Sequence, residues 1–425
     1  MFKQFLISLF LGITISSCKP KDIKTFVIQD RVDITTISPD STDFSDLEAI
    51  GKAIGDSRVV MLGEQDHGDA PTFLAKSRLV KYLHEKMGFN VLAFESDFFA
   101  LNRGWDQLEK QKSKIDPFIS ENIFRSWSSC LECENLLFDY IPKTFESQKP
   151  LEISGFDNQV HGTYSAKNLR TFLDDYLKRK KINYTQTKHY KDNFLSFIDS
   201  IKFNKNLEKQ LDFKKSLAQI DLELSTTDST NFESMLLRSL KGLTESEISF
   251  LKKGDDYLEL RDKQMAANLK WLVKYKYPNE KVIVWAHSSH TLKNPELFLI
   301  PRVQRIWKNM GGFFTADPQM AKRTYVLGFT SRTGTAGRVI NERKYTVPPP
   351  EPDSFETWIP QSVPYAFVDF KKFREENPSA NKRFLMKGRN HVTDLAPWLS
   401  IFDGVFYIRD MYPCALRESG NEPIK

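Results

Sequence analysis

Several carboxylates and imidazoles stand at the ends of short apolar runs, where they could act together on one substrate. These side chains are Glu64, His67, Glu95, Asp157 and His287. A neutral imidazole can accept a proton near neutral pH, because the ordinary pKa of histidine is about 6.5. A neighbouring carboxylate can hold such a base in one tautomer, and a second carboxylate can orient a water molecule. The set therefore predicts hydrolysis by a water molecule that a histidine activates. A buried polar network that only stabilises loops is the structural alternative.

The apolar runs themselves predict the elements that position these side chains. Residues 59–62 and 91–94 have the composition of buried strands, and Pro71 between them suits the first turn of a helix. Further strands are expected over 151–157, 282–286, 324–329, 366–369 and 404–408. Because strands alternate with helical segments, the expected fold class is α/β, with a largely parallel sheet flanked by helices. Ligands of such sheets bind at the carboxyl ends of the strands, where the candidate side chains stand.

A serine nucleophile and a bound metal ion are two other ways in which such a site could hydrolyse a substrate. A serine nucleophile is disfavoured, because the sequence has no Gly-x-Ser-x-Gly elbow. Glu64, His67, Glu95 and His287 could instead bind zinc or another divalent ion, since two imidazoles and two carboxylates suit such a metal. The spacing of Glu64 and His67 differs from the His-Glu-x-x-His pattern of helical zinc proteases. The sequence therefore favours a site without a metal, and a divalent metal remains the alternative.

Four ordered blocks of the chain resemble the erythromycin esterase family. They are Gly63-Glu64-x-x-His67-Gly68 with the strand that ends in Glu95, Gly155-Phe156-Asp157, Arg261-Asp262-x-x-Met265-Ala266-x-Asn268, and Trp285-Ala286-His287-x-x-His290. The resemblance covers most of the chain after its leader. It implies an esterase in which His67 is the base that activates water, with Glu64, Glu95 and His287 as the other catalytic residues.

The resemblance implies substrate-binding or supporting roles for a second group of residues. They are Arg261, His290, Asp157 and Asp66. Arg261 could point towards the site or could only pair with Asp157 or Glu64. Family members that act on macrolide antibiotics tend to carry an acidic residue and then aromatics soon after the motif histidine. This chain departs from that pattern at residues 71–73, so the resemblance implies an ester or lactone without identifying a macrolide.

Composition and the amino-terminal leader indicate an exported globular protein. Of the 425 residues, 40% are hydrophobic and 27% charged, and the net charge of +6 forms no basic stripe for nucleic acid. An apolar run over residues 5–15 is too short for a comfortable membrane span and fits a signal peptide over residues 1–17. Two serines before Cys18 resemble a bacterial lipobox. We therefore expect a lipidated Cys18, a polar tether over 18–30 and a membrane-anchored lipoprotein of the periplasm or outer membrane. An ordinary secretory signal is the alternative.

A change in composition divides the rest of the chain. Residues 180–254 are rich in Lys, Asp, Ser and Leu at helical spacing, which predicts a helical insertion between two parts of one catalytic domain, 31–179 and 255–425. This insertion is either a lid over the site or a solvated bundle without a chemical role. Cys130 and Cys133 predict structural thiols or a disulfide between them, because an exported protein can oxidise such a pair.

These features together predict an exported, lipid-anchored α/β hydrolase. Its expected partner is a small-molecule ester or lactone and not a nucleic acid, and its site is expected to need no cofactor. Two alternatives remain open. One is a metal-dependent hydrolase or peptidase that uses the same residues, and the other is a surface lipoprotein that binds a ligand without catalysis.

Overall fold

The protein is organised around one large mixed sheet. Its computed structural model describes residues 22–224, 230–298, 308–339, 344–378 and 382–417. Within them nine strands form a sheet in the order β1-β8-β11-β6-β2-β5-β3-β4, and β7 pairs with β6. The strands from β11 to β4 are parallel to their neighbours, whereas β1 and β8 are antiparallel at one edge and β7 is antiparallel to the end of β6. The predicted α/β fold with a largely parallel sheet is therefore confirmed.

Each strand expected from the sequence is present. The strands of the large sheet are β1 Val32–Asp33, β2 Val59–Glu64, β3 Phe89–Asp97, β4 Glu152–Asp157, β5 Lys281–His287, β6 Thr324–Gly337, β7 Lys344–Val347, β8 Tyr365–Val368 and β11 Gly404–Met411. A separate pair consists of β9 Phe384–Met386 and β10 Asp394–Ala396. The main difference is β6, which continues beyond the predicted end of its apolar run.

The sheet buries apolar side chains on both faces, which explains why its strands are continuous apolar runs. In β2, Val59 and Met61 belong to the core on one face, and Val60 and Leu62 belong to the core on the other. All four side chains are at most 1% exposed. Burying one such side chain contributes roughly 1.5–3 kcal/mol. The central strands are thus fixed in register, so side chains at their ends are held in defined positions.

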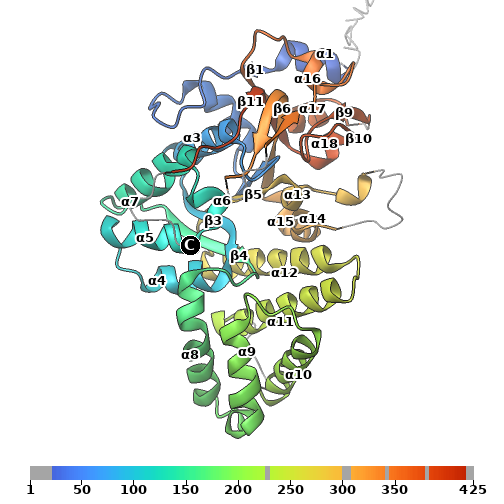
Figure 1. The fold of residues 1–425 in the computed structure, drawn as a ribbon. Coiled ribbons are helices and arrows are strands. Elements are labelled where there is room, and N and C mark those ends of the chain that lie inside the picture. Colours follow the sequence, from blue (N-terminus) through green and yellow to red (C-terminus); the bar gives the residue numbers. More distant parts are fainter. Residues whose placement is uncertain (1–21, 225–229, 299–307, 340–343, 379–381, 418–425) are drawn as a thin grey trace, which may run out of the picture.

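Helices cover both faces of the sheet, and one group of them extends away from it (Figure 1). Their bounds are α1 Ile23–Asp30, α2 Glu48–Ile54, α3 Ala70–Met87, α4 Trp105–Gln107, α5 Lys112–Asn122, α6 Arg125–Ser128, α7 Ile141–Thr144, α8 Thr163–Arg179, α9 Leu195–Ser200, α10 Leu207–Leu224, α11 Phe232–Leu251, α12 Tyr257–Trp271, α13 Ser288–Thr291, α14 Met310–Thr315, α15 Pro318–Lys322, α16 Phe355–Trp358, α17 Phe370–Glu376 and α18 Trp398–Ile401. The extending group, in green at the bottom of Figure 1, consists of α8 to α11.

The stretch 180–254 is helical, as its composition predicts. Its described residues form α9, α10 and α11 and no strand. α11 packs along α12, where Nδ2 of Asn268 donates to Oγ of Ser239 at 3.1 Å. Since α12 also carries Arg261, this stretch supports a helix that reaches the carboxyl ends of the strands. A role as a lid stays a prediction.

The predicted tether over 18–30 is wrong for its second half. Residues Ile23–Asp30 form α1, in which Phe26 and Val27 are buried. The ring of Phe26 packs edge-on against Phe373 with 5.1 Å between the ring centres. This segment is therefore part of the folded domain.

The predicted signal peptide over 1–17 and the lipidation of Cys18 lie outside the described residues. Within the residues that are described, no helix combines the length and the apolar character needed to cross a membrane.

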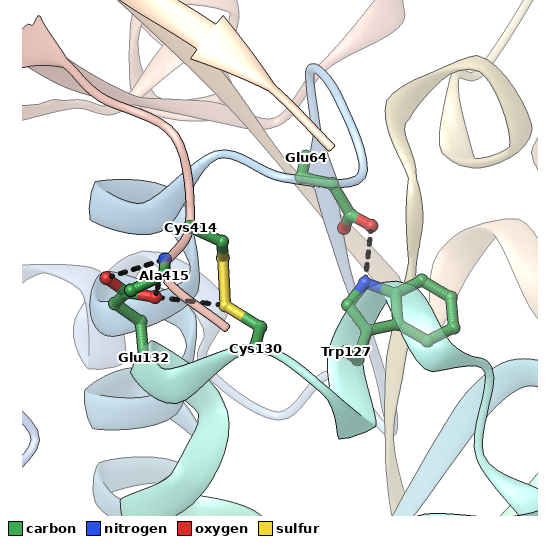
Figure 2. The surroundings of a disulfide bond; sticks show 6 residues. All are labelled: Glu64, Trp127, Cys130, Glu132, Cys414 and Ala415. Atoms are coloured by element: carbon green, nitrogen blue, oxygen red, sulfur yellow. Dashed lines mark hydrogen bonds between the residues drawn. A yellow bond between two sulfur atoms is a disulfide. The ribbon is translucent and has the colours of Figure 1, made fainter. Parts of the chain in front are cut away.

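Of the two alternatives predicted for Cys130 and Cys133, the disulfide between them is wrong. Cys130 forms a disulfide with Cys414, which lies 284 positions further along the chain, and the two Cα atoms are 5.7 Å apart. Figure 2 shows this bond between the segment after α6 and the tail after β11. Cys133 is a buried free thiol, and burial raises its pKa well above the usual value. Cys133 is thus a structural thiol with little thiolate character.

Candidate active site

The carboxyl ends of four parallel strands bring the predicted side chains to one edge of the sheet. Glu64 ends β2 and lies opposite His287, which ends β5. Glu95 lies near the end of β3, beside β5, and Asp157 ends β4, beside β3. Gly63 allows α13 to pack directly on the end of β2, because a Cβ atom there would lie 2.4 Å from a side-chain oxygen of that helix.

Glu64 is the centre of a buried hydrogen-bond network. Its Oε1 accepts from Nδ1 of His67 and from Nε1 of Trp127, each at 3.1 Å, and its Oε2 accepts from Nζ of Lys76. Neither Glu64 nor Lys76 is exposed, and Nζ of Lys76 lies 4.1 Å from the centre of the Trp285 ring. Burial lowers the pKa of Lys76, and Glu64 opposes this effect by favouring the ammonium. The network fixes the position of the Glu64 carboxylate.

His67 is held so that one ring nitrogen stays open. Because a carboxylate only accepts hydrogen bonds, the contact with Glu64 places a hydrogen on Nδ1 of His67 and a lone pair on Nε2. Nε2 has no hydrogen-bond partner among the described residues. The ring lies between Trp127 and His287, with 5.3 and 5.0 Å between ring centres, and its side chain is 14% exposed. His67 is therefore placed to accept a proton from a water molecule.

His287 is held in the opposite tautomer. Its Nδ1 accepts from the backbone N–H of Ser289 at 3.0 Å, which leaves the hydrogen of the neutral ring on Nε2. Burial, together with the positive charge of His290, lowers the pKa of His287 well below its ordinary value. The ring is thus neutral near pH 7 and offers an N–H donor, which suits a developing negative charge.

Glu95 is bound by positive groups and by one backbone N–H. Its Oε1 accepts from Nη2 of Arg261 at 3.0 Å and lies 3.2 Å from Nε2 of His290. Its Oε2 accepts from the backbone N–H of His287 at 3.0 Å. Burial acts to raise the pKa of Glu95, but the positive charges of His290 and Arg261 and the backbone N–H of His287 lower it well below the ordinary value. Glu95 is therefore an ionised carboxylate whose Oε2 has a lone pair left to orient water.

Arg261 joins two of the strand ends. Its Nε and Nη2 bind the two oxygens of Asp157 at 3.1 and 2.6 Å, and Nη2 also binds Glu95. Burial opposes the charge of Arg261, but Asp157 and Glu95 raise its pKa. The side chain of Arg261 is 14% exposed. Of the pairings considered from the sequence, the one with Asp157 is present, and the contacts of Arg261 run to Glu95 and not to Glu64.

His290 carries a fixed positive charge. Its Nδ1 donates to Oδ1 of Asp262 and its Nε2 faces Glu95. Burial alone would lower the pKa of His290, but Asp262 and Glu95 raise it to about 9. Asp262 is fully buried. The sequence patterns assigned it no role, although it adjoins Arg261 in one of the matched blocks.

Asp66 supports the loop of His67 and does not contact its ring. Oδ1 of Asp66 accepts from the backbone N–H of His67 at 2.8 Å and from Nε of Arg338 at 2.6 Å. Its Oδ2 accepts from the hydroxyl of Tyr345 at 2.6 Å. Although burial opposes ionisation, Tyr345 and Arg338 lower the pKa of Asp66. These contacts fasten the loop after β2 to the hairpin of β6 and β7.

One group of possible metal ligands lies close together in the described part of the chain. Within the described residues, three possible ligands with donor atoms less than 4.8 Å from one another occur at Cys130, Glu132 and Cys414, and the two cysteines are joined in the disulfide. The glutamates and histidines of the candidate site form no such group in that part of the chain.

The sequence reasoning missed residues that hold the site from other elements. They are Lys76 on α3, Trp127 on α6 and Asp262 on α12. Lysine on a helix is usually a solvated residue, and the contact of Trp127 with Glu64 spans 63 positions. Neither feature leaves a local pattern in the sequence.

Comparisons with known proteins give one family profile and several related proteins. A profile of the family described as erythromycin esterase matches residues 84–396. The Bacillus subtilis protein "Putative hydrolase YbfO" is 28% identical over 350 residues, which cover 76% of this chain and 77% of that protein. "Erythromycin esterase type II" of Escherichia coli is 25% identical over 407 residues, covering 86% and 92%. The structure of a mutant of the erythromycin esterase EreC in its open conformation has a TM-score of 0.61 at 18% identity, covers 91% of this chain and 98% of that one, and shows the same fold.

Proposed function

Since this chain belongs to the erythromycin esterase family and is a hydrolase, we propose that it cleaves an ester or lactone by direct attack of a water molecule that His67 activates. One observation carries the proposal. Nδ1 of His67 is bound to Glu64 at 3.1 Å, while its Nε2 is open and the side chain is partly exposed. The proposed reaction needs no cofactor.

The first step forms a tetrahedral intermediate. A water molecule lies between Nε2 of His67 and the carbonyl carbon of the substrate, and the free lone pair of Glu95 orients it. His67 takes one proton as the water oxygen bonds to the carbon. Glu64 stabilises the imidazolium that forms, and general base catalysis of this kind contributes typically ~10²–10⁴-fold.

The second step releases the alcohol. The oxyanion accepts hydrogen bonds from Nε2–H of His287 and from the guanidinium of Arg261. Preorganised donors of this type are worth roughly 10²–10³-fold each. The intermediate collapses, the carbon–alkoxide bond breaks, and the imidazolium of His67 returns its proton to the leaving oxygen. The products are the carboxylic acid and the alcohol, or one hydroxy acid from a lactone.

The substrate is proposed as a small molecule with an ester or lactone bond. The departure from the macrolide-acting pattern falls on Pro71, Thr72 and Phe73, and all three are buried in α3. These side chains pack inside the fold, and the sequence departs at them from the pattern of the macrolide-acting members. We assign no macrolide specificity.

The location is proposed as outside the cytoplasm, with Cys18 lipidated. The Cys130–Cys414 disulfide supports export, because such bonds persist in oxidising compartments. Metabolic labelling with an alkyne fatty acid in a bacterial host tests the anchor. Label is expected on the wild type and not on Cys18→Ser, and equal labelling of both would contradict it.

Hydrolysis assays on the purified protein test the function. Turnover of a panel of aryl esters and lactones is measured with and without a chelator. Intact-protein mass spectrometry of quenched samples gives the mass of the enzyme during turnover. We expect turnover that a chelator leaves unchanged, with the enzyme at its unmodified mass. Turnover lost to chelator and restored by a divalent ion would favour the metal-dependent hydrolase. A mass increased by the acyl group would contradict direct attack by water.

A further inference from the structure

The tail after β11 contacts the loop that carries His67. The backbone N–H of Ala70 donates to the carbonyl of Tyr412 at 3.1 Å, and the N–H of Cys414 donates to the carbonyl of Gly68 at 2.8 Å. Gly68 directly follows His67. The tail is therefore joined by main-chain hydrogen bonds to the loop of the proposed base.

The same tail is joined on its other side to the segment that follows α6. The N–H of Leu131 donates to the carbonyl of Ala415, and the N–H of Arg417 donates to the carbonyl of Ser129, both at 2.9 Å. The Cys130–Cys414 disulfide closes this contact covalently, as Figure 2 shows. The tail is thus a bridge between the loop of His67 and α6.

Trp127 extends from α6 into the site. Its indole N–H donates to Oε1 of Glu64 at 3.1 Å, and its ring stands edge-on to His67 at 5.3 Å. Figure 2 places Trp127 and the disulfide on one continuous segment, and the backbone N–H of Cys130 donates to the carbonyl of Trp127 at 3.1 Å. The disulfide is therefore joined to Trp127 both by a short stretch of chain and by a direct backbone hydrogen bond.

α6 has four residues, too few to hold its own position by helix formation. Its place comes from tertiary contacts, among which the disulfide is the one that can be broken chemically. Cys130 is buried, whereas Cys414 is partly exposed between Tyr412 and Leu416, which are 45% and 63% exposed. A small thiol can therefore reach the bond from the side of the tail.

We propose that Trp127 is a positioning residue for the Glu64–His67 pair, and that the Cys130–Cys414 disulfide holds Trp127 in place, so that reduction of this bond slows the hydrolysis. The consequence for rate rests on the proposed function. Reduction by a dithiol breaks the sulfur–sulfur bond and gives two protein thiols, while the dithiol becomes a cyclic disulfide. With the bridge open, Trp127 no longer fixes Oε1 of Glu64, and the base loses its alignment.

The first arm of the test does not depend on activity. Nitrogen-15 spectra report the indole N–H of Trp127, assigned with Trp127→Phe, before and after addition of dithiothreitol. The resonance is expected to move on reduction. In the double variant Cys130→Ser/Cys414→Ser, the resonance is expected at its position in the reduced protein. Addition of the dithiol is expected to leave it there. Cys133→Ala is the matched control, since it removes the other buried thiol, and it is expected to respond as the wild type does.

The second arm follows ester turnover. Reduction, the double variant and Trp127→Phe are each expected to lower kcat by about 10-fold and to change KM by less than about 2-fold, since the loss is one of alignment and not of binding. Trp127→Phe is expected to lose its response to dithiol. An unmoved resonance in protein whose thiols are shown by mass to be reduced would overturn the inference, as would full kcat in Trp127→Phe. Failure of the wild type to cleave any ester would refute the proposed function instead, and the resonance would still decide whether the disulfide holds Trp127.

Discussion

His290 makes the stability of the fold depend on pH in the alkaline range. It is buried between Asp262 and Glu95, which outweigh the effect of burial and raise its pKa from 6.5 to about 9. The native state thus binds this proton more tightly than the unfolded chain does. The resulting stabilisation is complete below about pH 6.5 and is lost as the pH rises through about 9. A rise of about 2.5 in pKa corresponds to about 3 kcal/mol, at about 1.36 kcal/mol for each unit.

Urea unfolding of the oxidised wild type and of His290→Gln, at about pH 6 and about pH 9.5, measures this contribution. Comparison of the two proteins cancels the titration of lysines and tyrosines elsewhere. The difference in their free energies of unfolding is expected to be larger at the lower pH by about 3 kcal/mol. Equal differences at the two pH values would refute the reasoning, because His290 would then carry no additional proton in the native state.

Three further results are expected. Lys76→Met should lower the free energy of unfolding by ~3–5 kcal/mol, because it leaves Glu64 buried without its ammonium. The double variant Lys76→Met/Glu64→Gln should regain part of the lost free energy of unfolding in the same urea titration. An unchanged free energy of unfolding in Lys76→Met would contradict the stabilising role of the buried pair. Arg261→Lys should lower kcat for ester hydrolysis by ~10²-fold through the loss of its forked donor, and unchanged kcat would remove it from the site. Removal of residues 1–30 should lower the melting temperature, because α1 packs on Phe373; equal melting would show that α1 adds nothing.

The strands of the sheet could be predicted because a parallel strand covered on both faces must be apolar throughout. Val59, Val60, Met61 and Leu62 show this directly, since they alternate between the two cores. The ends of such strands share one edge, so the convergence of Glu64, Glu95, Asp157 and His287 was also predictable. Their individual hydrogen-bond partners were not, because these partners lie on α12, on α13 and in the loop after β2.

Other features depend on contacts between distant parts of the chain and leave no local pattern. Lys76 looks like an ordinary helical lysine until its helix is packed against the end of β2. The partner of Cys130 could not be deduced from spacing, because connectivity is set by the fold. The eight residues of α1 are too few for a clear helical period, and only their packing shows that they belong to the core.

The central claim is that His67 is the base that activates water. The most direct test is the ratio of kcat/KM for wild type and His67→Gln on the ester that the wild type cleaves fastest, with circular dichroism to show that both are folded. The account predicts a loss of ~10²–10⁴-fold in the variant. A folded His67→Gln protein that cleaves the ester at the wild-type rate would contradict it.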